Sequence, residues 1–542
     1  MFDQLRFDYL SCAGHPHLHT PNIDALAARG LRFTRAYVQS PVCGASRMST
    51  YTGRYTSSHG AQWNGYPLRV GEMTLGDHLR PLGMGCWLVG KTHMRADVEG
   101  MKRLGLSPDS VIGARQAECG FDIWCRDDGL WSAGPDGCYD PRPSPYEAYL
   151  KSRGYEGDTP WADYANAALE DGRTVSGWFL MNARKPANIR EEDSETPWLT
   201  GEAIRFIEQA RSPWCAHVSY IKPHWPYIVP APYHAMFGAD QVVPPRRSEA
   251  ERADPHPIYA AFMDTPVARA LSRDEVREQV IPAYMGLIRQ ADDQMGRLFA
   301  FLEDSGRMED TMIVITSDHG DYLGDHWLGE KDLFHEPSVK VPLIIYDPSP
   351  EADASRGTNC DALVESIDLA ATFIETAGGK VPGHVVEGHT LLPFLRGERP
   401  DDWREVAISE YDYSMLPICE RLGLAPRDAR LFMVAGRRWK YVHAEGGFRP
   451  MLFDLENDPD ELHDLGASPD HSEVIAQMHA HLCSWARRMA QRVTMSDARI
   501  IAARGASDRK GILIGAASPD DVAPELAAFY QGKARKDRSG RG

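Results

Sequence analysis

Residues 41–54 read PVCGASRMSTYTGR, and the expected architecture can be built outward from this segment. An apolar run stops at Pro41, and Cys43 stands at the predicted start of a short helix that Gly53 ends. Arg47 lies one helical turn after Cys43. A helix N-terminus and a guanidinium both favour an anionic or oxygen-rich group at this position. A buried, inert thiol is the ordinary alternative for a single cysteine.

Apolar strands and amphipathic helices alternate over the first part of the chain. The clearest helix covers residues 281–305, where apolar side chains recur with a period of 3.6 residues. Residues 105–160 and 240–258 are rich in Gly, Pro and charged residues, which predicts loops or linkers. Buried strands are expected at 31–38, 84–89, 214–221, 311–317 and 341–346, and further helices at 20–30, 202–210 and 363–378. This alternation predicts an α/β protein with a mostly parallel sheet.

Polar side chains follow three of these predicted strands directly. Lys91 and His93 come after the second strand, His224 after the third, and Asp318 with His319 after the fourth. Ligands of open α/β sheets bind at the carboxyl ends of strands, so we expect the chemistry there. Taken singly, each histidine is more often a loop or cap residue than a catalytic one.

The pattern changes toward the C-terminus. Short alternating runs in residues 404–455 predict a small antiparallel sheet, and a helix is expected over 472–492. We therefore predict a catalytic domain at residues 1–400, a C-terminal subdomain at 401–492 and an extension at 493–542. The extension contains apolar islands among charged residues. It is either a disordered tail or, as we expect, an arm that holds a homodimer or homotetramer together.

Composition restricts the partners. The formal net charge is −18, which argues against nucleic acid or an anionic membrane, so an anionic substrate needs a locally basic pocket. No apolar run is long enough to span a membrane, and we see no signal peptide. The ten cysteines show no disulfide-like spacing, which favours the cytoplasm. The periplasm is the alternative, because the N-terminus looks truncated.

The motif Cys-x-Ala-x-Arg, followed by a Ser/Thr-rich turn and Thr-Gly-Arg, resembles the signature of the sulfatases, with Ala45 in place of the commoner Pro. In that family the cysteine is oxidised to Cα-formylglycine by dedicated machinery, and the hydrated aldehyde is the nucleophile. The resemblance extends to about residue 490. It implies the alkaline-phosphatase-like α/β fold, with a mostly parallel sheet flanked by helices and a smaller antiparallel subdomain.

The resemblance also implies one divalent metal ion. Asp3 and Gln4 look like the first metal-binding segment of the family, although only two residues precede Asp3. Asp318, His319 and the modified Cys43 would complete the site. A nitrogen ligand suits Mn²⁺ or Zn²⁺, whereas an all-oxygen set suits Ca²⁺, so the identity of the metal stays open.

Other matched positions imply catalytic and substrate-binding roles. Arg47, Lys91 and Lys331 would neutralise the non-bridging oxygens of the substrate. His93 would act as a base at the modified cysteine, and His224 with Lys331 would protonate or stabilise the leaving alkoxide. Asn64 matches a substrate ligand in one branch of the family. We expect Asp321, Asp325 and His326 to be structural.

Two enzyme branches and one non-enzyme hypothesis follow. Asp3-Gln4, Asp318-His319 and Asn64 resemble phosphonate monoester hydrolases and choline sulfatases, whereas Gly90-Lys91-Thr92-His93 resembles the sulfatases. We favour hydrolysis of sulfate monoesters, with phosphonate monoesters or phosphodiesters as the alternative or a side activity. If Cys43 is never oxidised, the chain would instead be a metal-binding relative with a structural role.

Overall fold

The computed structural model describes residues 1–129, 144–211, 213–504 and 515–530. Its contacts divide the chain into two units. The first comprises Met1–Val381 with Val386–Arg488, and the second comprises Pro382–Val385 with Met489–Gly542. The first unit therefore contains the predicted catalytic domain, except for Pro382–Val385, and most of the predicted subdomain. The boundary near residue 400 stays a prediction from sequence.

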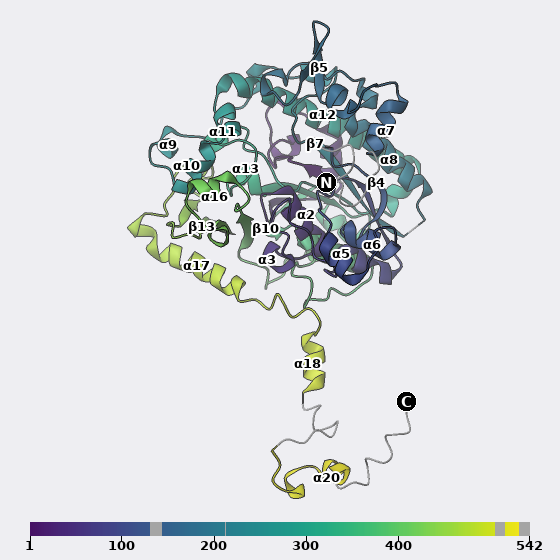
Figure 1. Cartoon of the computed structure of the whole chain (residues 1–542), viewed down its shortest axis with the longest axis vertical. Coiled ribbons are helices and arrows are strands. Elements are labelled where there is room, and N and C mark those ends of the chain that lie inside the picture. Colours follow the sequence, from purple (N-terminus) through teal and green to yellow (C-terminus); the bar gives the residue numbers. More distant parts are fainter. Residues whose placement is uncertain (130–143, 212, 505–514, 531–542) are drawn as a thin grey trace. The chain divides into compact units, whose positions relative to one another are not determined.

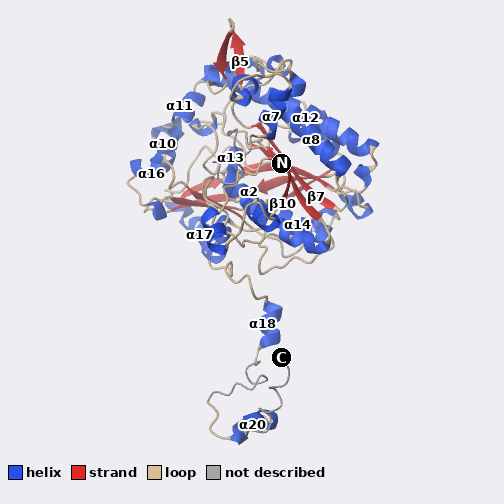
Figure 2. Cartoon of the chain, turned by 45° about the vertical axis from the view of Figure 1, so that its right-hand side comes forward, coloured by secondary structure: helices blue, strands red, loops and turns tan. Residues whose placement is uncertain are grey.

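Two four-stranded sheets form the centre of the first unit (Figure 2). One has the order β1-β7-β3-β4 with parallel pairs throughout; the other has the order β10-β2-β9-β8, in which β9 is antiparallel to both neighbours. A parallel bridge between Phe2 and Ser317 connects the two sheets. The strands are β1 (Phe2–Asp3), β2 (Leu31–Tyr37), β3 (Gly85–Gly90), β4 (Asp122–Arg126), β7 (Trp214–Pro223), β8 (Ile313–Thr316), β9 (Lys340–Tyr346) and β10 (Thr358–Glu365).

Helices cover both faces of this central sheet (Figure 2). On one side α12 (Asp274–Asp304) packs against α8 (Glu195–Gln209) and α1 (Pro21–Ala27). On the other side α2 (Cys43–Thr52) packs against α14 (Asp368–Thr376). The helices bury β9, which is apolar after Lys340, as expected for a strand covered on both faces. Strand β2 differs in carrying Arg32 and Arg35, and β10 begins with the exposed Thr358 and Asn359.

The predicted C-terminal subdomain sheet is present. Strands β11 (Ala407–Asp412), β12 (Arg430–Ala435), β13 (Trp439–Ala444) and β14 (Met451–Asp454) pair antiparallel in chain order. Helix α17 (Ser472–Ala486) packs on β12 and β13, and ends before the predicted residue 492 (Figure 1).

Two stretches differ from the sequence prediction. Residues 105–160, predicted as loops, contain α6 (Val111–Ala117), β4 and α7 (Pro145–Ser152), with residues 130–143 outside the described part. The predicted helix at 363–378 begins only at Asp368, because the preceding residues form β10 and pair with β2. Pairing with a neighbouring strand overrides local helix propensity there.

Three shorter helices interrupt the predicted linker at 240–258. They are a 3₁₀ turn at Ala239–Gln241, α9 (Glu249–Ala253) and the start of α10 (Pro257–Met263). In the second unit the apolar islands fall on α18 (Asp497–Ala503) and α20 (Pro524–Tyr530), while residues 512–514 lie outside the described residues. None of the described helices is long and apolar enough to cross a membrane.

Candidate active site

Cys43 is the first residue of α2 and is fully buried. Val42 precedes it with extended backbone, and Gly53 ends the helix at a left-handed φ of 66°, as predicted. The amide of Gly44 donates to Oδ1 of Asn64 at 2.7 Å. Asn64 therefore lies at the helix N-terminus beside Cys43, where its side-chain amide satisfies one of the free N–H groups.

Two carboxylates that lie far apart in the sequence, Asp3 and Asp318, meet at this helix. Asp3 ends β1, and Asp318 follows β8 by two residues. The Phe2–Ser317 bridge aligns the two segments, and the amide of Gln4 donates to Oδ1 of Asp318 at 3.1 Å. Ligand atoms of Asp3, Cys43, Asp318 and His319 all lie within 4.8 Å of one another. Two carboxylates, one imidazole nitrogen and the side chain at position 43 therefore form a set of donors that fits a divalent cation.

Gln4 supplies a further test of metal fit. Its Nε2 donates to Oδ2 of Asp321 at 2.5 Å and to the hydroxyl of Tyr227 at 3.0 Å. Its Oε1 is buried and accepts no hydrogen bond. A buried carbonyl oxygen without a partner is costly, and a divalent cation would satisfy it. Gln4 itself adopts a left-handed φ of 66°, a sparsely populated conformation for a residue other than glycine.

His319 is held in the tautomer that a metal ligand requires. Its Nδ1 lies 2.8 Å from the carbonyl oxygen of Gly320, which can only accept a hydrogen bond. Nδ1 therefore carries the proton and Nε2 presents its lone pair. That Nε2 atom lies 3.7 Å from Oδ1 of both Asp3 and Asp318. Burial lowers the pKa of His319, which favours the same neutral form.

Buried cations balance the carboxylates. Nε of Arg47 lies 2.7 Å from Asp318, and Nζ of Lys91 lies 2.5 Å from Asp3. The same guanidinium donates to Oγ of Ser219 at 2.7 Å. Burial alone would raise the pKa of Asp3, but the Lys91 and Arg47 cations hold that pKa well below its usual range. Arg47 and Lys91 thus support the carboxylates, in addition to any contact with substrate.

Lys331 approaches Cys43 from another direction. Its Nζ lies 3.3 Å from Sγ of Cys43 and 3.2 Å from Oε1 of Glu330. Burial opposes the charged ammonium of Lys331, whereas the neighbouring carboxylate of Glu330 favours it. Trp225 lies beside this group, with Nζ 5.8 Å from the ring centroid.

His224 faces the same centre in neutral form. Its Nδ1 lies 2.8 Å from the carbonyl oxygen of Trp225, so Nε2 carries the lone pair, 3.9 Å from Asp3. Burial lowers the pKa of His224 well below the usual value, and nearby Lys91 and Lys331 act in the same direction.

His93 reaches Cys43 from the turn after β3. It adopts a left-handed φ of 52°, and its side chain interacts with the Cys43 thiol. Oδ1 of Asp128 accepts from the amides of Thr92 at 3.1 Å and His93 at 2.8 Å. Arg126 pairs with Asp128 at 2.6 Å. Asp128 therefore fixes the turn that aims His93.

The structure brings all of the residues predicted for the site to one centre. Asp325 forms an ion pair with Arg6, and Nδ1 of His326 lies 2.7 Å from Oε1 of Glu251. Sequence reasoning missed the residues that hold the site in place: Ser219, Tyr227, Asp128 and Ser317. A polar residue at the end of a predicted strand was the available signal for Ser317, and a polar residue within a buried strand was the available signal for Ser219. Asp128 offered no such signal, because β4 was predicted as loop.

The family follows from the comparison with known sequences. Residues 1–379 match the Sulfatase family, and residues 324–488 match the family described as N-sulphoglucosamine sulphohydrolase, C-terminal. The chain belongs to the sulfatase family, whose members hydrolyse sulfate esters and related esters.

Individual relatives span almost the whole chain. The multifunctional alkaline phosphatase superfamily protein PehA of Trinickia caryophylli is 31% identical over 510 residues, covering 89% of this chain and 93% of PehA. An arylsulfatase of Clostridium perfringens is 26% identical over 487 residues, with coverages of 88% and 91%. One of these relatives is thus named as a multifunctional enzyme, and the other is named as an arylsulfatase.

Solved structures agree with this placement. The phosphonate monoester hydrolase SpPMH of Silicibacter pomeroyi superposes with a TM-score of 0.78 at 28% identity, covering 91% of this chain and 95% of that one. The phosphonate monoester hydrolase of Agrobacterium radiobacter gives a TM-score of 0.76 at 29% identity, with coverages of 90% and 94%. The predicted alkaline-phosphatase-like α/β fold is therefore confirmed.

Proposed function

We propose that this chain hydrolyses sulfate monoesters at the Cys43 centre, after Cys43 is converted to Cα-formylglycine. The position of Sγ carries the proposal: it lies 3.0 Å from Nε2 of His319 and 3.3 Å from Nζ of Lys331. A thiol in the middle of hard ligands and cations has no packing purpose there. The formylglycine hydrate would supply the nucleophilic oxygen at that position.

Asp3, Gln4, Asp318 and His319 would hold one divalent cation, which would supply Lewis-acid charge neutralisation. The unpartnered Oε1 of Gln4 supports four protein ligands besides the residue at position 43. We expect Ca²⁺ or Mn²⁺, with Zn²⁺ as the third choice, because oxygens predominate and His319 adds a single nitrogen.

Lys331 is the cation best placed for the substrate. Arg47 and Lys91 already pair with Asp318 and Asp3, whereas Lys331 points its ammonium at Cys43. Glu330 beside its ammonium favours the protonated form, so Lys331 can stabilise charge on the departing oxygen. His224 presents a lone pair at Nε2, so it must take up a proton before it can donate one.

His93 is the candidate base. Burial lowers its pKa, and the nearby charge of Lys91 acts in the same direction. The neutral imidazole can therefore accept a proton from an oxygen attached at position 43. Its Nδ1 is buried without a hydrogen-bond partner, which leaves that atom available to a water or substrate oxygen.

Hydrolysis of phosphonate monoesters or phosphodiesters is the second candidate. It is supported by the similarity to two phosphonate monoester hydrolases and to the multifunctional PehA. Lys91 after β3 is the observation on which we prefer sulfate, since it adds a buried cation next to the carboxylates.

The test compares initial rates on an aryl sulfate and an aryl phosphonate monoester with the same leaving group. A higher kcat/KM on the sulfate is expected, and a clear preference for the phosphonate would replace the first candidate with the second. Peptide mass spectrometry on the same sample tests the nucleophile. Formylglycine is about 18 Da lighter than cysteine, because oxygen replaces sulfur and two hydrogens are lost. An active sample with only unmodified Cys43 would contradict the mechanism.

A further inference from the structure

A series of contacts leads from Cys43 to a half-exposed tryptophan. Nζ of Lys331 lies 3.3 Å from Sγ of Cys43 and 5.8 Å from the ring centroid of Trp225. The ring of Trp225 in turn lies 4.9 Å from that of Trp178, measured between centroids. Cys43 is fully buried, whereas Trp178 is 45% exposed. The aromatic rings thus begin beside the ammonium that faces the reactive position and end at the surface of the protein.

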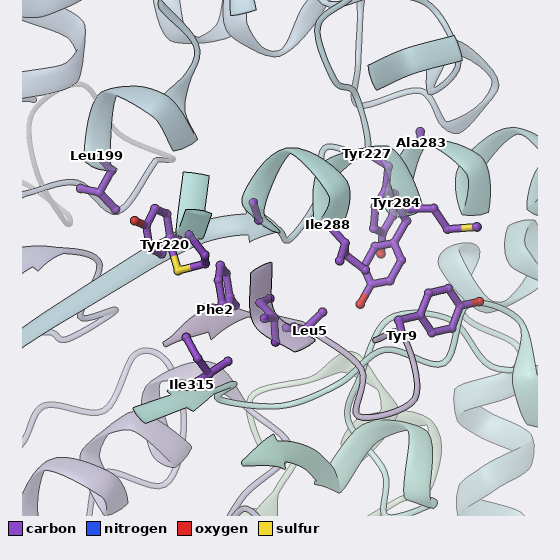
Figure 3. Packing of buried hydrophobic residues seen from close by; sticks show 14 of the residues in the cluster. Phe2, Leu5, Tyr9, Leu199, Tyr220, Tyr227, Ala283, Tyr284, Ile288 and Ile315 are labelled. Atoms are coloured by element: carbon purple, nitrogen blue, oxygen red, sulfur yellow. The ribbon is translucent and has the colours of Figure 1, made fainter. Parts of the chain in front are cut away.

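Trp225 is fixed through both its ring and its backbone. Its Nε1 donates to Oε1 of Glu330 at 2.7 Å, and the same oxygen pairs with Lys331 at 3.2 Å. Two residues later, Tyr227 lies in a buried cluster, where its ring meets that of Tyr284 edge-on at 6.1 Å (Figure 3). Because these contacts hold the segment in place, the indole of Trp225 offers a preorganised apolar surface next to Lys331.

Trp178 is held just as firmly. It follows strand β6 (Arg173–Ser176) by two residues. The amide of Gly177 donates to the carbonyl oxygen of Asn166 at 2.8 Å, and a Cβ atom on Gly177 would lie only 2.6 Å from that oxygen. Only glycine permits so close an approach of two backbone segments. The ring of Trp161 also lies 6.4 Å from that of Trp178, so backbone and neighbouring ring together fix this indole.

The two indoles suit a ligand larger than either of them could hold alone. Their planes are inclined by 58°, so their faces point in different directions. Aromatic rings attract one another both offset-stacked and edge-to-face, at centroid separations of about 4.5–7 Å. A flat bicyclic group whose oxygen contacts Lys331 is long enough to touch both Trp225 and Trp178. A small alkyl group in the same position would reach only Trp225.

We propose that Trp225 and Trp178 form the leaving-group subsite, and that they select esters whose leaving group is flat, apolar and about as large as a naphthyl ring. The acid group of the ester would lie at Cys43, its bridging oxygen at Lys331 and the remainder of the leaving group on the two indoles. This inference rests on the proposed ester hydrolysis. It does not depend on whether the ester is a sulfate or a phosphonate, because the leaving group is common to both.

The test measures kcat/KM for naphthyl sulfate and for trifluoroethyl sulfate, whose leaving group has no ring. Trp178→Ala should lower the value about tenfold for the naphthyl ester and less than about twofold for the trifluoroethyl ester. Trp178→Phe keeps a ring and should recover part of the loss. The same pair of phosphonate monoesters replaces the sulfates if phosphonates prove to be the better substrates.

Phe179→Ala is the matched control. Phe179 is 70% exposed, more than Trp178, and among the described residues it makes no ring contact. Its replacement should leave both rates unchanged. A general apolar surface that binds another protein would depend on Phe179 at least as much as on Trp178. Equal losses in the two alanine variants would therefore overturn the proposal. So would equal losses of Trp178→Ala on the two esters, or no loss on the naphthyl ester.

A binding measurement separates failure of the subsite from failure of ester hydrolysis. Calorimetric titration with naphthol, the free leaving group, requires no catalysis. The wild type and Phe179→Ala should bind naphthol equally well, and Trp178→Ala about tenfold more weakly. Equal affinities in all three proteins, or no binding to the wild type, would contradict the subsite even in a chain that is active on another ester. Loss of affinity in Trp178→Ala alone would support it even in a chain that hydrolyses neither ester.

Discussion

The Sγ atom of Cys43 and the Nε2 atom of His319 lie 3.0 Å apart, at a point that Asp3 and Asp318 also approach. The imidazole presents a lone pair there, because its other nitrogen donates to Gly320. The thiol of Cys43 therefore lies next to an imidazole nitrogen whose lone pair is free to bind a metal ion. This relationship separates the chemical role of Cys43 from that of the other described cysteines, all of which are free.

Replacing Cys43 by Ala should abolish turnover, by at least about 10³-fold, because the substitution removes the thiol whose oxidation would supply the nucleophilic group. The fold should persist, since only one buried sulfur is lost. Initial rates and circular dichroism check both statements. Cys86→Ala is the matched control, because Cys86 is equally buried in β3 and takes no part in the site. Near-normal rates in the Cys43 variant would refute the proposed nucleophile.

Gln4→Ala should lower metal affinity, since it removes the buried Oε1 that has no other partner. A reduction of about 10- to 100-fold is the expected scale for a supporting oxygen ligand. Elemental analysis after dialysis against a chelator series measures it. Gln290→Ala controls for loss of a buried glutamine, because Gln290 bonds Glu191 and Ser194 instead. If both variants keep full metal, Gln4 is not a ligand.

Lys91→Ala should lower turnover of sulfate esters more than turnover of phosphonate esters. Both substrates lose the support that Lys91 gives to Asp3, so that common effect cancels in the ratio of the two losses. The remaining difference reports the charge that Lys91 offers to non-bridging oxygens. Parallel kcat/KM measurements give the ratio, and a ratio of one would remove our reason for preferring sulfate.

Asp128→Ala should reduce kcat more than it raises KM. The substitution removes the carboxylate that accepts hydrogen bonds from the backbone amides of Thr92 and His93 and so holds the left-handed turn at His93. A loss of about 10- to 100-fold is expected for a misaligned base. Asp128→Asn keeps a carbonyl oxygen for the same amides and should recover part of the activity. Identical losses in the two variants would argue for a charge effect rather than a positioning one.

The buried ammonium of Lys222 should make the stability of the protein depend on pH. Burial lowers its pKa to about 8, with Glu195 opposing the shift, whereas an unfolded lysine titrates near 10.4. Between these values the unfolded chain binds more protons, so this group makes the free energy of unfolding rise with pH, by up to about 1.4 kcal/mol per unit.

Urea unfolding of the wild type and Lys222→Met at pH 7.5 and 9.5 isolates that contribution. The difference in stability between the two proteins should shift in favour of the wild type at the higher pH. Lys185→Met serves as a surface control, because Lys185 pairs with an exposed glutamate. A difference that is the same at both values would mean that Lys222 titrates normally.

Much of the site could be predicted because it lies where strands end. Asp318, His224 and Lys91 each follow a buried apolar run, and a parallel sheet brings such positions to one edge. The supporting contacts could not be predicted in the same way. The contact between Asp128 and His93 depends on β4. We predicted this segment as a loop, because the sequence around it is rich in Gly, Pro and charged residues. Strand β10 was missed for a similar reason, since its pairing with β2 depends on residues far away in sequence.

The complete burial of Cys43 sets an order of events during synthesis. The thiol is closed in partly by His319, which the ribosome adds 276 residues later. At about 5–20 residues per second, roughly 14–55 s pass between the two. Under the conversion proposed above, an oxidising enzyme would have to reach Cys43 within that interval or before the sheet closes. Maturation would then compete with folding, and a host that translates quickly or oxidises slowly would accumulate folded protein with an unmodified Cys43.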